Sequence, residues 1–235
     1  MNYISRVISS VVLALGIFAT GYTIAESIRY FRNFERAVEV KGLAEQVVKS
    51  DLATWNISFS VSGESLKDLY QQISTQQKQV SQFLVDNGFA PADIQLATVS
   101  VTDNLANQYG NNSKVAHFQI NNSVSVTTKD VDLVAQVSQK ASELVSRGII
   151  ISSNGINYFY NNLNTIKGQM LNSATQNAKL AAATFAKNTN SQVGKIKTAN
   201  QGVFSISSPD GSIIGDTSSI NKKVRVVTSI QFFLN

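Results

Sequence analysis

The sequence predicts an α+β protein, in which an N-terminal transmembrane helix precedes a body of helices packed on a largely antiparallel sheet. Period-two alternation of apolar and polar residues marks several short segments as strands, and apolar residues at helical spacing mark longer segments as helices. The order of these segments in the body is β-α-β-β-α-β-α-β-β. Single strand–helix–strand steps mixed with hairpins are typical of this class.

The N-terminal helix is predicted from a charge-free apolar segment between Arg6 and Glu26. A helix of roughly 19 residues is about 28 Å long, close to the ~30 Å hydrocarbon core of a bilayer. We therefore expect Val7–Ala25 to contact the lipid bilayer as a single-pass anchor. Residues 1–35 would form the anchor and stalk, and residues 36–235 the body. The alternative is a cleaved signal peptide, cut after Gly21 or Ala25.

The first half of the body contains the clearest strand pattern. Residues 53–61 place apolar side chains on one face and Thr, Asn and Ser on the other, after an earlier strand piece at 38–43. Ser65 and Asp68 form a capping-box pattern that begins a helix, and Asn87-Gly88 ends it. Residues 94–102 and 116–127 are predicted strands, joined by a polar hairpin loop that contains NQYGNNS.

The second half alternates helices and strands. Asp130 begins the second predicted helix, and Arg147-Gly148 ends it. Residues 149–160 are rich in β-branched and aromatic side chains, which predicts a strand. The longest predicted helix covers residues 163–187. Strands at 193–206 and 223–233 complete the body and are separated by the polar stretch SSPDGSIIGDTSSIN.

Composition excludes several classes of function. Charged residues make up 15% of the chain, against roughly 25% in ordinary domains, so repulsion between identical copies is weak. The net charge of +5 comes without a basic stripe interleaved with aromatic residues, so we expect no nucleic-acid partner. The chain has no cysteine, which removes disulfides, thiolate catalysis and thiolate metal ligands.

No residue pattern predicts a catalytic, cofactor-binding or metal site, and we expect no enzyme activity and no cofactor. Neither a nucleophile elbow nor a glycine-rich phosphate loop is present. His117 is the single histidine, and we expect it to be a surface or hairpin residue. Asp210 and Asp216 are the candidate calcium ligands, but they lack the alternating acidic pattern of a calcium loop, which favours a plain turn.

The remaining candidates also have structural interpretations. Asp130 and Asp132 lie at a helix start, where the macrodipole favours acidic residues. Asp51 and Asp93 are predicted to cap backbone groups next to a strand and a turn. The aromatic run at 158–160 could stack a ligand, but packing in the core and at a sheet edge is the favoured interpretation.

Five segments resemble a known family in their order and spacing: VKGLAEQVVKSDLATWNISFSVSG, LVDNGFAPADIQLATVSVTDN, FQINNSVSVTTKDVDLVAQVSQKASELVSRGI, NSATQNAKLAAATFAKNTNSQVGKI and KKVRVVTSIQFFL. They resemble the SIMPL-domain proteins of bacterial cell envelopes, from about Val38 to the C-terminus. The resemblance implies a periplasmic or membrane-associated protein without established enzymatic activity and with loose links to stress tolerance. It also favours a body outside the cytoplasm, on the periplasmic side of the inner membrane, whereas the arginines that flank the anchor favour the cytoplasm.

Two functional hypotheses follow from the sequence. The first is a non-enzymatic, membrane-anchored cell-envelope protein that assembles into a homo-oligomer, most simply a closed ring, because low charge and uncovered strand edges favour self-association. The alternative is a periplasmic small-molecule or peptide-binding module that uses a groove between helices and sheet. A hydrolase is disfavoured, since a Ser-His-Asp triad would have to use His117.

Overall fold

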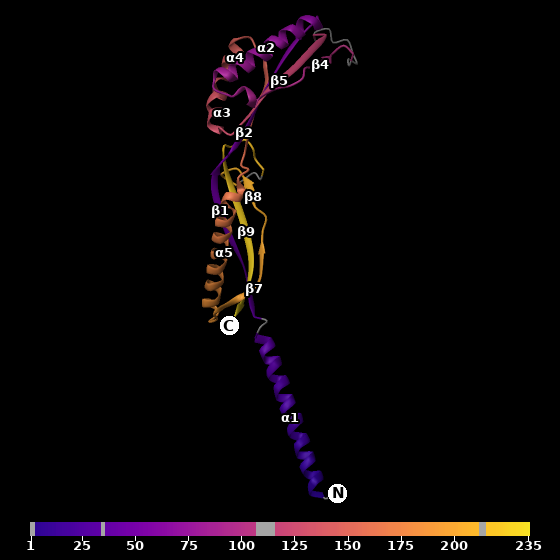
Figure 1. The fold of residues 1–235 in the computed structure, drawn as a ribbon, viewed down its shortest axis with the longest axis vertical. Helices are drawn as coiled ribbons and strands as arrows, with labels where there is room; N and C mark the ends of the chain where they lie inside the picture. Colours follow the sequence, from indigo (N-terminus) through magenta and orange to yellow (C-terminus); the bar gives the residue numbers. More distant parts are fainter. Residues whose placement is uncertain (1–2, 34–35, 107–115, 212–214) are drawn as a thin grey trace. The chain divides into compact units, whose positions relative to one another are not determined.

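The chain forms two compact units in a computed structural model (Figure 1). The structure describes residues 3–33, 36–106, 116–211 and 215–235, and within the first helix it describes the side chains of residues 12–27. Unit 1 contains residues 1–45, 166–204 and 225–235, and unit 2 contains residues 46–165 and 205–224. Each unit is therefore assembled from stretches that are distant in the sequence.

The helices and strands follow the predicted order, with additional breaks. They are α1 (Tyr3–Asn33), β1 (Ala37–Lys49), β2 (Leu52–Gly63), α2 (Leu66–Asp86), a 3-10 turn (Pro91–Asp93), β3 (Ile94–Leu96), β4 (Ser100–Asp103), β5 (Phe118–Thr128), α3 (Val131–Ser138), a 3-10 turn (Gln139–Ala141), α4 (Ser142–Ser146), β6 (Ile151–Phe159), α5 (Leu163–Asn188), β7 (Val193–Gln201), β8 (Ser205–Ser207) and β9 (Asn221–Leu234).

The predicted transmembrane anchor is wrong. Among the described residues, no helix is long and apolar enough to cross a membrane. The sequence argument treated freedom from charge as equivalent to hydropathy, yet residues 12–27 of α1 include two glycines, two threonines and Glu26. The hydroxyls of Thr20 and Thr23 donate to carbonyls of the same helix at 2.8–2.9 Å. The single-pass inner-membrane location and the bilayer contact through Val7–Ala25 lose their support with it, and the side chains of residues 7–11 lie outside the described part.

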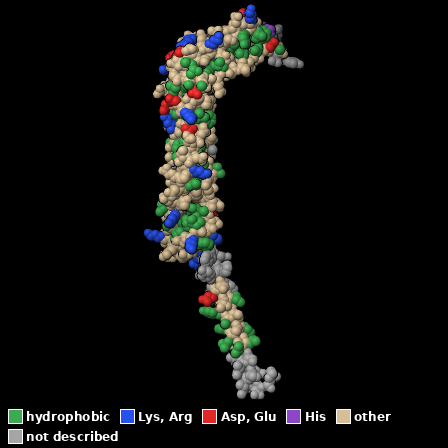
Figure 2. All heavy atoms as spheres, viewed as in Figure 1, with side chains coloured by type: hydrophobic (Ala, Val, Ile, Leu, Met, Phe, Trp, Pro, Cys, Tyr) green, Lys and Arg blue, Asp and Glu red, His purple; other side chains and the backbone are tan. Residues whose placement is uncertain are grey.

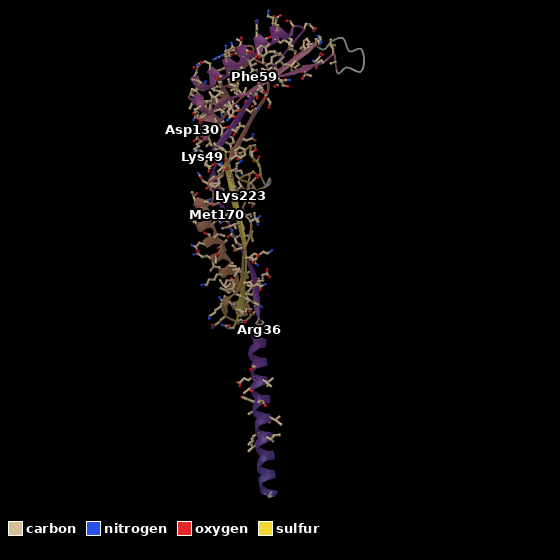
Figure 3. All side chains as sticks on the ribbon, turned by 45° about the vertical axis from the view of Figure 1, so that its right-hand side comes forward. Arg36, Lys49, Phe59, Asp130, Met170 and Lys223 are labelled. Carbon is tan, nitrogen blue, oxygen red and sulfur yellow. The ribbon has the colours of Figure 1, made fainter. Side chains whose placement is uncertain are left out.

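Unit 2 is a five-stranded antiparallel sheet with helices on one face. The strand order is β3-β5-β2-β6, and β4 also pairs with β5. Figure 1 shows α2, α3 and α4 on the same side of this sheet. The predicted alternation in β2 is confirmed, because its apolar side chains are buried beneath the helices, with Phe59 (Figure 3) and Trp55 fully covered. The opposite face presents half-buried Ser, Thr and Asn side chains.

The ends of α2 lie where the capping residues predict them. The Ser65 hydroxyl accepts a hydrogen bond from the backbone N–H of Asp68 at 3.5 Å. After Asn87, Gly88 adopts a φ of +100°, which the absence of a Cβ permits. Between these ends, α2 buries one stripe of side chains against the sheet: Leu69, Ile73, Gln76, Val80, Phe83 and Leu84.

Two predicted elements of unit 2 are interrupted. The strand expected at 94–102 is divided into β3 and β4, because the side-chain amide of Gln77 in α2 donates to the Ala97 carbonyl at 3.1 Å. The helix expected after Asp130 is divided into α3, a 3-10 turn and α4. Near this break the Ser138 hydroxyl donates to the Ala135 carbonyl at 3.1 Å, a back-bond that bends helices. The predicted loop NQYGNNS lies outside the described residues.

Unit 1 is a thin two-layer structure, in which α5 runs along a sheet of order β1-β9-β7 (Figure 1). β9 runs antiparallel to β7. It is also antiparallel to β1, since the contacts Arg36–Leu234 and Glu45–Arg225 join opposite ends of the two strands. Small side chains of α5 face the sheet, and Met170 (Figure 3) begins this stripe, which continues with Ala174, Ala178, Ala182 and Ala186.

Two glycines allow backbones to approach closely in unit 1. A Cβ on Gly42 of β1 would lie 1.8 Å from the Ala174 carbonyl oxygen of α5. A Cβ on Gly202 would lie 2.2 Å from the Val227 carbonyl oxygen, which instead accepts the Gly202 N–H at 2.9 Å. The second contact explains why the strand predicted at 193–206 ends as β7 and resumes as β8. The α+β class and the antiparallel pairing are confirmed.

Candidate functional site

Unit 2 contains an open apolar hollow between the N-terminal half of α2 and β4. Its volume is about 570 Å³, and its lining consists of Leu66, Lys67, Tyr70 and Gln71 from α2 and Val101 from β4. Figure 2 shows apolar side chains at the surface of this part of the unit, close to the single histidine. Concave apolar surfaces with a few polar groups are the usual form of ligand sites.

Helix geometry explains why these side chains remain at the surface. The buried stripe of α2 includes Leu69 and Ile73, whereas Leu66 and Tyr70 lie four residues apart on a neighbouring face. Leu66 is 43% exposed and Tyr70 is 57% exposed. Val101 is 49% exposed, although it pairs with the fully buried Ile120 of β5. The sequence contained one signal of this surface, the Leu66–Tyr70 spacing outside the main stripe, which the sequence analysis did not use.

Lys67 gives the hollow a positive rim. Its side chain is exposed, and no described carboxylate forms a salt bridge with it. An unpaired ammonium group beside an apolar surface attracts a ligand that carries an anionic group next to apolar ones. The hollow therefore combines apolar burial with one fixed positive charge.

His117 lies at the base of the β4–β5 hairpin. Its Nε2 atom is 3.3 Å from Oδ1 of Asp103, and its ring stacks on Phe118 with a centroid distance of 3.8 Å. The pKa of Asp103 is lowered, first by the N–H of Ala106, then by the N–H of Leu105 and by His117, against a smaller opposing effect of desolvation. No described hydroxyl is hydrogen-bonded to the His117 ring, so the described contacts assemble no serine–histidine pair.

The acidic residues that were predicted to cap backbone groups do so at two positions. The Asp51 carboxylate accepts the backbone N–H groups of Asn161 and Asn162 at 2.8–3.0 Å. The Asp130 carboxylate accepts the N–H of Leu133 at 3.0 Å and begins α3. Asp132, in the first turn of this helix, forms a salt bridge with Lys49. Asp93 lies in the 3-10 turn that follows Pro91, and its N–H donates to Ala90.

The Asp210–Asp216 loop is held by local hydrogen bonds. Asp210 accepts the Ser208 hydroxyl at 2.5 Å, and Asp216 accepts both the N–H and the hydroxyl of Ser218 at 3.0 and 2.8 Å. These bonds from Ser218 lower the pKa of Asp216. No group of three metal-ligating side chains occurs among residues that the structure describes. In the aromatic run, Tyr158 is buried, Phe159 is 36% exposed at the edge strand, and the Tyr160 hydroxyl donates to the Asn162 carbonyl at 3.1 Å.

Lys222 is a buried lysine that the sequence analysis did not anticipate. It is 1% exposed, and its Nζ donates to the Asp216 carbonyl at 2.6 Å. Burial lowers the pKa of Lys222, and the Asp216 charge opposes this effect. Its position on β9 explains the burial, because even-numbered residues of this strand face inward. The ammonium group ties the 216–220 loop to the start of β9.

Comparisons with known proteins identify the family. The model of the family described as SIMPL, protein of unknown function (DUF541), matches residues 38–227. This match covers most of the chain, which therefore belongs to the SIMPL family, as the resemblance implied. A search of curated protein sequences found no match.

Solved structures give distant similarities. A hydantoinase/carbamoylase-family amidase from Burkholderia multivorans is 10% identical with a TM-score of 0.22, and the match covers 52% of this chain and 28% of the amidase. An uncharacterized conserved protein from Listeria innocua is 7% identical over 78% of this chain and 91% of its own, with a TM-score of 0.20. A hydrolase from Listeria innocua is 8% identical with a TM-score of 0.20, covering 82% and 92% of the two chains. The chain thus spans about 28% of the length of the two Burkholderia amidases that it matches, and at these scores none of the similarities bears on function.

Proposed function

We propose that this SIMPL protein is a non-enzymatic component of the cell envelope that works as a homo-oligomer assembled through the sheet of unit 1. The observation that carries the proposal is the pair of uncovered edges of this sheet. β1 and β7 are the end strands of the order β1-β9-β7, and the outer edge of each pairs with no described strand. Unpaired backbone N–H and C=O groups at such edges favour pairing with another chain.

The two edges carry opposite charges. β7 exposes Lys195 and Lys197, whereas β1 exposes Glu39 and Glu45 together with Lys41. Within the chain, Glu45 lies 3.5 Å from Arg225, and Glu39 accepts the Gln231 amide at 3.1 Å, so both carboxylates are held on the sheet. Apposed opposite charges select the β7–β1 contact over contacts between two copies of one edge.

Unit 1 also leaves much of its apolar surface uncovered. Its buried cluster contains five residues, Val40, Ala178, Ala182, Ile230 and Phe232. In contrast, Ile196 is 52% exposed, Phe185 is 55% exposed and Leu180 is 67% exposed. A neighbouring copy would cover part of this surface, and apolar burial stabilises association by about 25 cal/mol per Å² before the costs of binding are subtracted.

The direction of the strands specifies the geometry of the assembly. Both β1 and β7 are antiparallel to β9, so they are parallel to each other. A rotation that places β7 of one copy beside β1 of the next therefore creates a parallel pair. This contact is heterologous, and repeated rotation closes it into a ring or extends it as a filament. We propose the closed ring.

Sedimentation velocity of the full chain at micromolar concentration tests the proposal. We expect the wild type to sediment as an oligomer, and the double variant K195E/K197E to sediment as a monomer, because like charges then face each other across the contact. The matched control is K167E/K179E, which changes the same charge on the exposed face of α5. A monomeric wild type, or equal dissociation of both double variants, would contradict the proposed contact. Complementation of a deletion strain under envelope stress with the same variants tests the cellular part of the proposal.

A further inference from the structure

The second inference concerns unit 2 and is independent of the proposed assembly. Residues 94–103 form one edge of the five-stranded sheet, where β3 and β4 pair successively with β5. No described strand pairs with the outer side of Ser100, Val101 or Thr102. These backbone groups are available to another extended segment.

The side chains along this edge face the helix layer in alternation. Leu96 pairs with Val124 and Val101 pairs with Ile120, and both partners are fully buried on the helix side of the sheet. Leu96 and Val101 therefore lie on that same side, yet they are 57% and 49% exposed. The sheet edge and the hollow are thus parts of one surface.

The other wall of this surface is α2, through the exposed side chains of Leu66 and Tyr70. A helix beside an uncovered edge strand leaves space for one added strand. Its backbone would pair with β4, and its alternate side chains would enter the hollow.

We propose that the groove between α2 and β4 binds an extended peptide segment of a partner protein by strand addition. Two features define the chemistry of the peptide. Alternate positions are apolar and pack on Leu66, Tyr70 and Val101, and a carboxylate on the same face lies opposite Lys67. Charge complementarity favours this occupant, because the described residues leave the Lys67 ammonium without a salt bridge. Proline is excluded at positions whose N–H bonds to β4.

A displayed library of random nonapeptides, selected on the full chain, supplies the probe. We expect an enriched set of proline-poor peptides in which apolar residues alternate and an acidic residue recurs. The most enriched peptide, labelled with fluorescein, is then titrated by anisotropy. Tyr70→Ala should weaken binding about tenfold or more, as truncation of a central aromatic contact does. Lys67→Glu should weaken it about two- to fivefold or more, the range of an exposed ion pair.

Matched variants keep the inference falsifiable. Lys78→Glu makes the same charge change on the exposed surface of α2 beyond the hollow, and Leu180→Ala truncates an exposed apolar residue of unit 1, so both should bind normally. Amide chemical-shift changes in a labelled chain should concentrate at 100–102. Failure to enrich any peptide, equal effects of Lys67→Glu and Lys78→Glu, or shift changes confined to the hollow as for a small amphiphile, would each overturn the proposal. Because K195E/K197E retains unit 2, it should bind the peptide normally whether or not it assembles.

Discussion

Replacement of Gly42 by alanine tests the packing of α5 on β1 in unit 1. An alanine Cβ would lie 1.8 Å from the Ala174 carbonyl oxygen and 2.7 Å from the Ala178 nitrogen, and both atoms belong to the helix backbone. Non-bonded atoms pack at roughly 3.5 Å, so strand and helix would have to separate by about 1.7 Å. The separation would open the alanine stripe and stretch the bond from the Asn177 amide to the Leu43 carbonyl, now 2.7 Å.

The expected cost is the sum of two effects. Overpacking of a close contact costs about 1–3 kcal/mol, and the hydrogen bond contributes about 1 kcal/mol. We therefore expect Gly42→Ala to lower the free energy of unfolding by about 3 kcal/mol, measured by urea denaturation with circular dichroism. Gly168→Ala is the control, since its Cβ would meet nothing within 4 Å, and it should stabilise the exposed helix by up to about 1 kcal/mol. A Gly42→Ala protein as stable as the wild type would refute this account of α5 packing.

Three further predictions concern unit 2. Asp51→Ala should lower the free energy of unfolding by about 1–2 kcal/mol in the same urea assay, because the N–H groups of Asn161 and Asn162 lose their acceptor; an unchanged value would refute the capping role. Burial lowers the pKa of Lys222 below the ordinary 10.5, so the unfolded chain keeps its proton to higher pH than the folded chain does. The contribution of Lys222 to stability should therefore increase as pH rises toward 10.5, and Lys222→Met should remove this pH dependence; a variant with the wild-type pH dependence would contradict it. His117→Ala should leave the unfolding midpoint and the sedimentation coefficient unchanged, since the described contacts of the ring are exposed Asp103 and its neighbour Phe118; loss of either property would give His117 a role that its contacts do not indicate.

The elements that could be predicted from the sequence are those whose signals are local. The alternation in residues 53–61 predicts β2 because burial on one face of a strand follows a period of two. Ser65 and Gly88 predict the ends of α2 because capping depends on residues within one turn of the helix end. Asp51 and Asp130 were predicted as capping residues for the same reason.

The remaining features depend on contacts between distant residues. The break between β3 and β4 follows from a hydrogen bond between Gln77 and Ala97, and the end of β7 follows from the approach of Gly202 to Val227. Lys222 was expected to be exposed, as lysines usually are, and its burial depends on the loop that supplies the Asp216 carbonyl. The hollow requires β4 to lie beside α2, which the sequence pattern of neither element specifies.

A mixing experiment tests the assembly through β1 and β7 most directly. K195E/K197E gives both edges a negative charge, and E39K/E45K gives both edges a positive charge, so each variant alone should be monomeric by native mass spectrometry. An equimolar mixture restores opposite charges at every contact and should re-form an oligomer in which the two variants alternate. The account predicts oligomers with equal numbers of the two chains in the mixture. Monomers in the mixture, or oligomers of either variant alone, would contradict it.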